Sequence, residues 1–233
     1  MSKSTITLQN VSKKYGKETA LAHVDLSIDH KGIIGVIGLN GSGKSTLLKM
    51  IAGLVQPSSG EVLFENQKIT RRIGSHIAFL SELDALYSFQ TVAQAVKLWD
   101  GAIDDFSSDK AHKILQSLNV DTNKKIKTMS KGYRARVKLA VTLARNVPVL
   151  IMDEPLSGLD PIVREDILKI IVSNVDLEKQ MLILSTHEVS EVEPFLDYVI
   201  FLKNGEIVLN EAVETLREDR GLSVIEAMRE VLI

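Results

Sequence analysis

The sequence predicts an α/β protein that has a mostly parallel sheet, an N-terminal antiparallel β subdomain and an inserted helical subdomain. Continuous apolar runs are typical of buried parallel strands, and a helical pattern follows each of GIIGVIG (32–38), VPVLIMD (147–153) and MLILST (181–186). TITLQNV (5–11) and AHVDLSI (22–28) alternate apolar and polar residues, which indicates half-buried antiparallel strands. Between these groups, the stretch 83–146 is mainly helical in pattern.

The alternation of strands and helices predicts layers around one mostly parallel sheet. We therefore expect a single domain over 1–233, in which 1–82 and 147–233 form the core with its β subdomain and 83–146 form the helical subdomain. Gly53 is expected to end the helix that follows the first apolar run. Asp160 precedes Pro161 as a possible cap of another helix, and Asn204-Gly205 predicts a tight hairpin.

The composition excludes several classes of function. The chain has 233 residues and no cysteine, so disulfides, thiolate catalysis and cysteine-ligated zinc are excluded. The net charge of −2 gives no overall electrostatic reason to bind nucleic acid, and we expect none as a partner. No apolar run approaches the ~18 residues that a spanning helix needs, so a membrane role would require a separate chain.

The glycine-rich stretch GLNGSGKST follows the first buried strand and opens a helix. Its spacing fits G-x-x-x-x-G-K-[ST], in which glycines let backbone N–H groups approach phosphate oxygens. The helix N-terminus favours the same negative charge, Lys44 would neutralise the β- and γ-oxygens, and Ser45 would ligate Mg²⁺. The alternative is a turn that merely caps a helix. The predicted nucleotide-binding residues are Gly38, Leu39, Asn40, Gly41, Ser42, Gly43, Lys44, Ser45 and Thr46.

A pair of acids follows the second buried strand. Asp153 comes after four apolar residues and is predicted to hold Mg²⁺, and Glu154 could polarise the attacking water as a general base. Solvated acids in a strand-end turn are the alternative. Together with the glycine-rich loop, the pair predicts a nucleoside triphosphate hydrolase with a P-loop core.

Further motifs resemble, in their order, those of ATP-binding cassette (ABC) ATPases over nearly the whole chain. Tyr15 occupies the position at which that family stacks an aromatic ring on adenine. Asp160 ends SGLD, which resembles the loop that crosses to a partner subunit, and His187 in LSTHE resembles the switch histidine. The resemblance implies ATP and Mg²⁺ as cofactors, with Lys44, Glu154 and His187 as catalytic residues.

Two motifs depart from the family pattern. The signature LSGGQ is here MSKGY, which keeps Ser130 and Gly132 as expected γ-phosphate contacts but places Lys131 and Tyr133 where glycine and glutamine are usual. The segment IAFLSELDALY (77–87) is expected to be the loop that joins the core to the helical subdomain, and it carries Glu82 where the family has glutamine. Glu82 is either a metal ligand or a solvated acid.

The resemblance implies that two cassettes, copies or homologues, enclose two ATP molecules and drive a separate multi-span membrane permease. MSKGY resembles ATPases of bacterial exporters, so we expect export, with this chain cytoplasmic and peripheral on the inner face of the cell membrane. The segment 82–90 is expected to lie in the groove that docks the permease. The alternatives are a soluble ABC ATPase that acts on ribosomes or nucleic acid, another phosphate-loop class, and a binding-only cassette.

Overall fold

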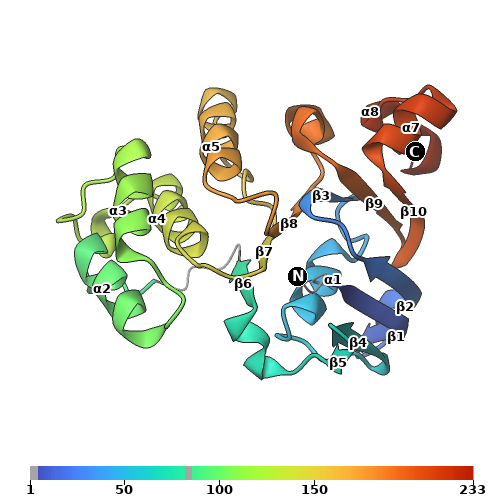
Figure 1. Ribbon diagram of the computed structural model, residues 1–233, viewed down its shortest axis with the longest axis horizontal. Coiled ribbons are helices and arrows are strands. Elements are labelled where there is room, and N and C mark those ends of the chain that lie inside the picture. The colour runs from blue at the N-terminus through green and yellow to red at the C-terminus, as the bar shows by residue number, and fades with distance from the viewer. Residues whose placement is uncertain (1–4, 82–85, 233) are drawn as a thin grey trace.

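The computed structural model describes residues 5–81 and 86–232, and Glu82 therefore lies outside the described residues (Figure 1). A four-stranded antiparallel sheet has the order β2-β1-β4-β5. Its strands are β1 (Ile6–Tyr15), β2 (Glu18–Ile28), β4 (Ser59–Phe64) and β5 (Gln67–Lys68). β1 and β2 confirm the two antiparallel strands that the alternating patterns predict.

The second sheet has six strands in the order β10-β9-β3-β8-β7-β6, all parallel except β10. They are β3 (Gly32–Ile37), β6 (Ile77–Leu80), β7 (Val149–Met152), β8 (Met181–Thr186), β9 (Tyr198–Lys203) and β10 (Glu206–Ala212). The three continuous apolar runs form β3, β8 and β7 side by side, as predicted. Asn204 and Gly205 both have positive φ in the turn that joins β9 to β10, which confirms the hairpin.

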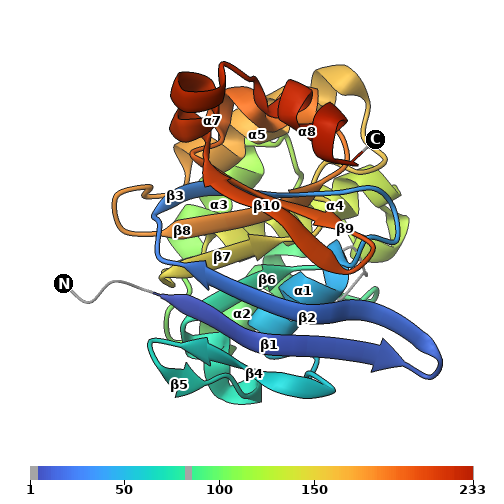
Figure 2. The same cartoon turned by 90° about the vertical axis from the view of Figure 1, so that its right-hand side faces the viewer.

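Helices cover the second sheet on both faces. The helices are α1 (Lys44–Ile51), α2 (Val92–Ala102), α3 (Ser108–Ser117), α4 (Lys131–Leu143), α5 (Pro161–Ser173), α6 (Val189–Val192), α7 (Val213–Arg220) and α8 (Val224–Leu232). Short 3₁₀ turns lie at Arg71–Ser75, Ile126–Thr128 and Glu193–Phe195. Figure 2 shows α1 between the two sheets. α7 and α8 lie at the top of that view, on the other side of the parallel sheet from α1.

Two hydrophobic cores share the strands of the parallel sheet. Ile34 and Val36 of β3 pack into a core with α1 and the antiparallel sheet, whereas Ile33 and Ile37 pack into the core that the other helices cover. Both faces of each central strand are thus buried, which explains why the strand sequences are continuous apolar runs.

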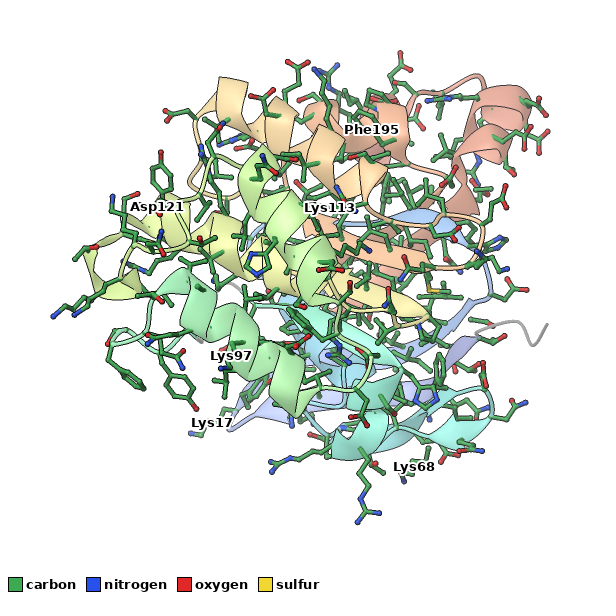
Figure 3. All side chains as sticks on the ribbon, turned by 60° about the vertical axis from the view of Figure 1, so that its left-hand side comes forward. Lys17, Lys68, Lys97, Lys113, Asp121 and Phe195 are labelled. Atoms are coloured by element: carbon green, nitrogen blue, oxygen red, sulfur yellow. The ribbon has the colours of Figure 1, made fainter. Side chains whose placement is uncertain are left out.

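The segment 83–146 contributes α2, α3 and α4, and Figure 3 shows α2 and α3 side by side with Lys97 and Lys113 labelled on them. Both lysines are exposed, while Ala95 of α2 and Ile114 of α3 are buried in the core. Each helix is therefore amphipathic and packs its apolar face inward. The division of the chain into a core and a separate helical subdomain remains a prediction.

Two expectations need correction. Ile77–Leu80 is not part of a loop: it is a strand that pairs in parallel with β7, because its apolar residues complete the buried edge of the sheet. Asp160 does occupy the N-cap position of α5, but its carboxylate makes no capping hydrogen bond among the described residues. Its side chain is exposed and is available for contacts outside the chain.

Arg145, just after α4, fixes segments that are distant in sequence. Its guanidinium is 6% exposed, pairs through Nε and Nη2 with the carboxylate of Asp105, and donates from Nη2 to the carbonyl of Gly74 at 2.5 Å. Asp105 lies between α2 and α3, and Gly74 lies in the turn before β6. One buried cation therefore links the helices of 83–146 to the edge of the parallel sheet.

We expect Arg145→Met to lower the free energy of unfolding by roughly 3 kcal/mol, because it leaves the Asp105 carboxylate without its buried counter-charge. Urea unfolding followed by circular dichroism measures the change. The double variant Arg145→Met/Asp105→Asn is the control and should recover part of the loss, since no unpaired charge then remains. An unchanged midpoint in the single variant would contradict the assigned role.

Candidate active site

The loop between β3 and α1 wraps closely around its own backbone. Gly41 and Gly43 have φ of 81° and 107°, in the left-handed region that favours glycine. A Cβ atom on Gly43 would lie 2.6 Å from the carbonyl oxygen of Ala20, and one on Gly38 would lie 2.5 Å from that of Leu202. Gly41 is thus required by conformation, Gly38 by close packing, and Gly43 by both.

Helix α1 begins at this loop with its N-terminal amides uncapped. Gly43 at the N-cap supplies no side-chain hydrogen bond, and the first turn contains no acidic residue. The first backbone N–H groups of a helix have no intrahelical acceptor, and the helix dipole adds positive potential there. This terminus suits a phosphate group.

Lys44 is 6% exposed and its ammonium group lies within the loop. Nζ donates to the carbonyl oxygens of Gly38 at 2.8 Å and Leu39 at 3.2 Å, and it lies 3.5 Å from Oε1 of Glu154. The loop therefore holds a buried cation beside the uncapped helix terminus and beside one of the predicted acids.

Asp153 is 5% exposed and joins three elements at the carboxyl edge of the sheet. Its Oδ1 accepts hydrogen bonds from Ser45 Oγ of α1 at 2.9 Å and from Ser185 Oγ of β8 at 2.8 Å. Ser45 and Asp153, predicted as metal ligands although 108 positions apart in sequence, thus present adjacent hard oxygen atoms.

Glu154 is held in a strained conformation between two groups. Its φ is 49°, which is uncommon for a residue other than glycine, and its N–H donates to Ser185 Oγ at 2.9 Å. His187 Nδ1 lies 2.9 Å from Oε2, while Lys44 lies on the Oε1 side. The carboxylate therefore has a fixed direction, as a group that orients a reacting water needs.

These groups line one pocket of about 420 Å³. Tyr15, predicted as the adenine-stacking residue, is 48% exposed and lies in its wall at the end of β1. The lining residues are Tyr15, Glu18, Ala20, Asn40, Gly41, Ser42, Gly43, Lys44, Ser45, Thr46, Glu154, Ser157 and His187. An aromatic face at one end and a phosphate-binding loop at the other match the two ends of a nucleotide.

Three predicted nucleotide contacts lie outside this pocket. Ser130, at the N-cap of α4, is exposed and its Oγ accepts from the N–H of Tyr133 at 3.3 Å. Gly132 follows in the same first turn of α4, and Asp160 lies at the start of α5. None of the three lines the pocket that contains the chain's own glycine-rich loop.

Sequence reasoning missed Ser185, Glu18 and Ser157. Ser185 bonds both acids of the pair, and its signal was a hydroxyl near the end of a buried apolar strand. Glu18 and Ser157 also line the pocket. Glu18 has no signal in the sequence, whereas Ser157 begins the SGLD motif, in which only Asp160 was predicted as a site residue.

The residues fit Mg²⁺. Among the described residues no group of three or more His, Asp or Glu side chains gathers to enclose a metal ion unaided. Mg²⁺ keeps several waters and takes one or two protein oxygens together with phosphate oxygens. The Ser45 hydroxyl and the Asp153 carboxylate, close to a phosphate-binding loop, form such a donor set.

The family model of the ABC transporter matches residues 21–157, from β2 through the glycine-rich loop and the acid pair. This chain belongs to the ABC transporter family. Members that are similar include the lantibiotic transport ATP-binding protein SrtF of Streptococcus pyogenes, 32% identical over 88% of this chain and 90% of that protein. The aliphatic sulfonates import ATP-binding protein SsuB of Zymomonas mobilis is 33% identical over 97% of this chain and 95% of that protein.

A solved ABC cassette supports the same assignment. It is an ATP-binding cassette captured as a dimer in a post-hydrolysis state with ADP and phosphate. It is 27% identical to this chain, has a TM-score of 0.77, and is matched over 89% of this chain and 98% of its own length. The predicted P-loop fold class is confirmed, and the chain is an ATP-binding, ATP-hydrolysing subunit of an ABC transporter.

We expect Lys44→Ala to weaken ATP binding by roughly 2–3 kcal/mol, about 30- to 150-fold in Kd, because it removes a charge-assisted contact to phosphate oxygens. Titration with a fluorescent ATP analogue measures the affinity. Lys49→Ala, on the same helix but outside the pocket lining, is the matched control. Wild-type affinity in Lys44→Ala would contradict the role of this residue.

Proposed function

We propose that this cassette works as one half of an ATP-bound dimer and drives export through a separate membrane-embedded permease. One observation carries the proposal: Ser130 and Asp160 are exposed and lie outside the pocket formed by Lys44, Glu154 and His187. A second cassette packed head to tail would bring its own Ser130, Gly132 and Asp160 to that pocket. Family membership and the dimeric solved relative support this arrangement.

Each pocket residue then has a defined task. The N–H groups of the glycine-rich loop and the Lys44 ammonium bind the phosphates, Tyr15 stacks against the adenine, and Ser45 with Asp153 would hold Mg²⁺. Mg²⁺, when bound, neutralises charge that develops on the phosphate oxygens. Glu154 accepts the proton of the attacking water, and His187 keeps the Glu154 carboxylate in place.

ATP binding and hydrolysis would close and open the dimer. The γ-phosphate would be bound from both sides, by Lys44 of one cassette and by Ser130 of the other. ADP lacks this group and so cannot favour the closed state to the same extent. The altered signature adds Lys131, exposed at the first turn of α4, as a further positive charge beside Ser130. Glu82 remains a proposed Mg²⁺ ligand outside the described residues.

The permease partner would dock on an apolar groove beside α2. The groove has a volume of about 330 Å³ and is lined by Leu86, Tyr87, Gln90, Ala95, Leu98, Trp99, Ala102 and Ile103. Tyr87 and Phe89, 57% and 70% exposed, stand next to it with ring centroids 5.7 Å apart. Exposed aromatic side chains around an apolar groove are typical of protein-binding sites. We propose a short helix of the permease as the occupant.

A membrane partner agrees with the helices of the structure, none of which, within 5–81 and 86–232, is long and apolar enough to cross a bilayer. From the proposed permease partner we infer that the chain lies in the cytoplasm, bound through the permease to the inner face of the membrane. Export rests on the resemblance of MSKGY to exporter ATPases and on the lantibiotic transport relative. The sulfonate relative is named an import protein, so the direction of transport has to be tested.

A pull-down of the tagged protein from its host's membranes in mild detergent tests the partner. A polytopic protein with several ~20-residue apolar spans supports the proposal. Recovery with ribosomes or nucleic acid instead would favour a soluble ABC ATPase. For direction, inside-out vesicles that contain the complex are given a labelled lantibiotic-type peptide. ATP-driven uptake supports export, and ATP-driven release from preloaded vesicles contradicts it.

We expect the double variant Tyr87→Ala/Phe89→Ala to lose at least ~10-fold in recovery of the permease, because aromatic residues carry much of the binding energy of such interfaces. ATP hydrolysis by the isolated cassette should stay at the wild-type rate, since the groove lies outside the nucleotide pocket. Leu54→Ala is the control, because Leu54 is 54% exposed but lies outside the groove. Full recovery of the permease in the double variant would place the docking surface elsewhere.

We expect Glu154→Gln to retain ATP binding and to lower hydrolysis by about 10²- to 10⁴-fold, because the amide cannot accept the proton of the attacking water. The same variant should accumulate as an ATP-bound dimer in size-exclusion chromatography with Mg²⁺. Single-turnover hydrolysis measures the chemical step directly. Turnover at the wild-type rate would assign the base to another residue.

A further inference from the structure

A network of ion pairs lies between the Ser157–Asp160 loop and His187, and Arg164 is at its centre. The Arg164 side chain, in the first turns of α5, is 16% exposed. Nε donates to the carbonyl oxygen of Leu159 at 2.7 Å, within the loop that ends at Asp160. Nη1 pairs with Glu188 and donates to Glu191 Oε1 at 3.0 Å. One guanidinium thus contacts the loop and two of the acids that follow His187, Glu188 and Glu191.

The network continues from Glu188 to the proposed catalytic base. Glu188 Oε1 lies 3.8 Å from Nε2 of His187, and the other ring nitrogen of His187 lies 2.9 Å from Oε2 of Glu154. The imidazole therefore lies between two carboxylates, one near each ring nitrogen, so the two carboxylates compete for the position of the ring. Arg164 determines how strongly Glu188 competes, because it pairs with the Glu188 carboxylate.

Glu191 keeps Arg164 in this position. Its Oε2 atom is buried and has no hydrogen-bond partner among the described residues, so Arg164 supplies the hydrogen bond and charge partner of this carboxylate. Because one oxygen of this partly exposed carboxylate is shielded from solvent, loss of its counter-charge is costly, which makes the pair resistant to separation. The planar guanidinium has donors in a fixed fork, so the three contacts also fix their mutual geometry.

We propose that Arg164 is a positioning residue that couples the Ser157–Asp160 loop to His187 and thereby to Glu154. Movement of the loop carbonyl at Leu159 shifts the guanidinium of Arg164. The shift changes how strongly Glu188 attracts the His187 ring away from Glu154. A partner cassette that contacts Asp160 would in this way set the orientation of the catalytic carboxylate across the sheet edge. The inference rests on the proposed roles of Glu154 and His187.

We expect Arg164→Met to lower kcat for ATP hydrolysis by about 10- to 100-fold, because a base displaced by a fraction of an ångström loses its alignment with the attacking water. KM for ATP should change less than about twofold, since Arg164 lies outside the nucleotide pocket. Steady-state hydrolysis measures both constants. Arg164→Lys keeps a positive charge but cannot make all three contacts at once. Its kcat should therefore lie between that of the wild type and that of Arg164→Met.

Lys169→Met is the matched control, because Lys169 is on the same helix and pairs with Glu165 at an exposed i,i+4 position, away from His187 and the Ser157–Asp160 loop. Its kcat and KM should equal those of the wild type. The Tm of Arg164→Met, from thermal unfolding, shows whether the loss of activity comes from partial unfolding. If Arg164 positions the base, kcat stays low even at temperatures far below this Tm. Equal falls in affinity and kcat, or full recovery of kcat on cooling, would overturn the positioning role.

A second comparison separates this proposal from the proposed catalytic roles. In the double variant Arg164→Met/Glu188→Gln, the competing charge at Glu188 is gone, and kcat should recover at least about threefold over Arg164→Met. No recovery would overturn the coupling through Glu188. If Glu154→Gln and His187→Ala both hydrolyse ATP at the wild-type rate, the catalytic assignment itself fails. If they lose activity and Arg164→Met does not, only the coupling fails.

Discussion

The arrangement of the site depends on one buried carboxylate. Asp153 is almost wholly removed from solvent, and a charge in that position is tolerated only if its oxygens are hydrogen-bonded. The hydroxyls of Ser45 and Ser185 meet this need, and they belong to α1 and β8. The same bonds therefore set the distance between the glycine-rich loop and the acid pair, and they fix the strand edge from which His187 emerges.

Parallel strands make this convergence possible. β3, β7 and β8 are neighbours, and all three end at the same edge of the sheet. Asp153, about 110 positions from the loop in sequence, thus accepts a hydrogen bond from Ser45, and Ser185, about 140 positions from the loop, donates to the same carboxylate. The strained backbone of Glu154 follows from this geometry, since the chain must turn sharply at the end of β7 to present its carboxylate to His187.

The sequence allows prediction of the parts whose signals are local. Continuous apolar runs identified the three central strands, and the spacing from Gly38 to Ser45 placed the phosphate loop. The strand at Ile77–Leu80 was not predicted, because its form comes from pairing with β7, which is distant in sequence. Arg145 carries no local signal either, because its partner Asp105 is 40 residues away.

Two largely buried arginines, Arg145 and Arg164, fix the segments that carry Ser130 and Asp160, the residues that a second cassette would contact in the proposed dimer. Arg145 anchors the C-terminal end of α4, and Ser130 lies at the other end of that helix, about 20 Å away at 1.5 Å per residue. Between these two ends α4 is held by its buried residues, among them Val137 and Ala140. Arg164, in contrast, contacts the segment just before Asp160 directly. The two residues are thus held differently: Ser130 lies at the end of a helix that packs into the core, whereas Asp160 follows a carbonyl that Arg164 holds.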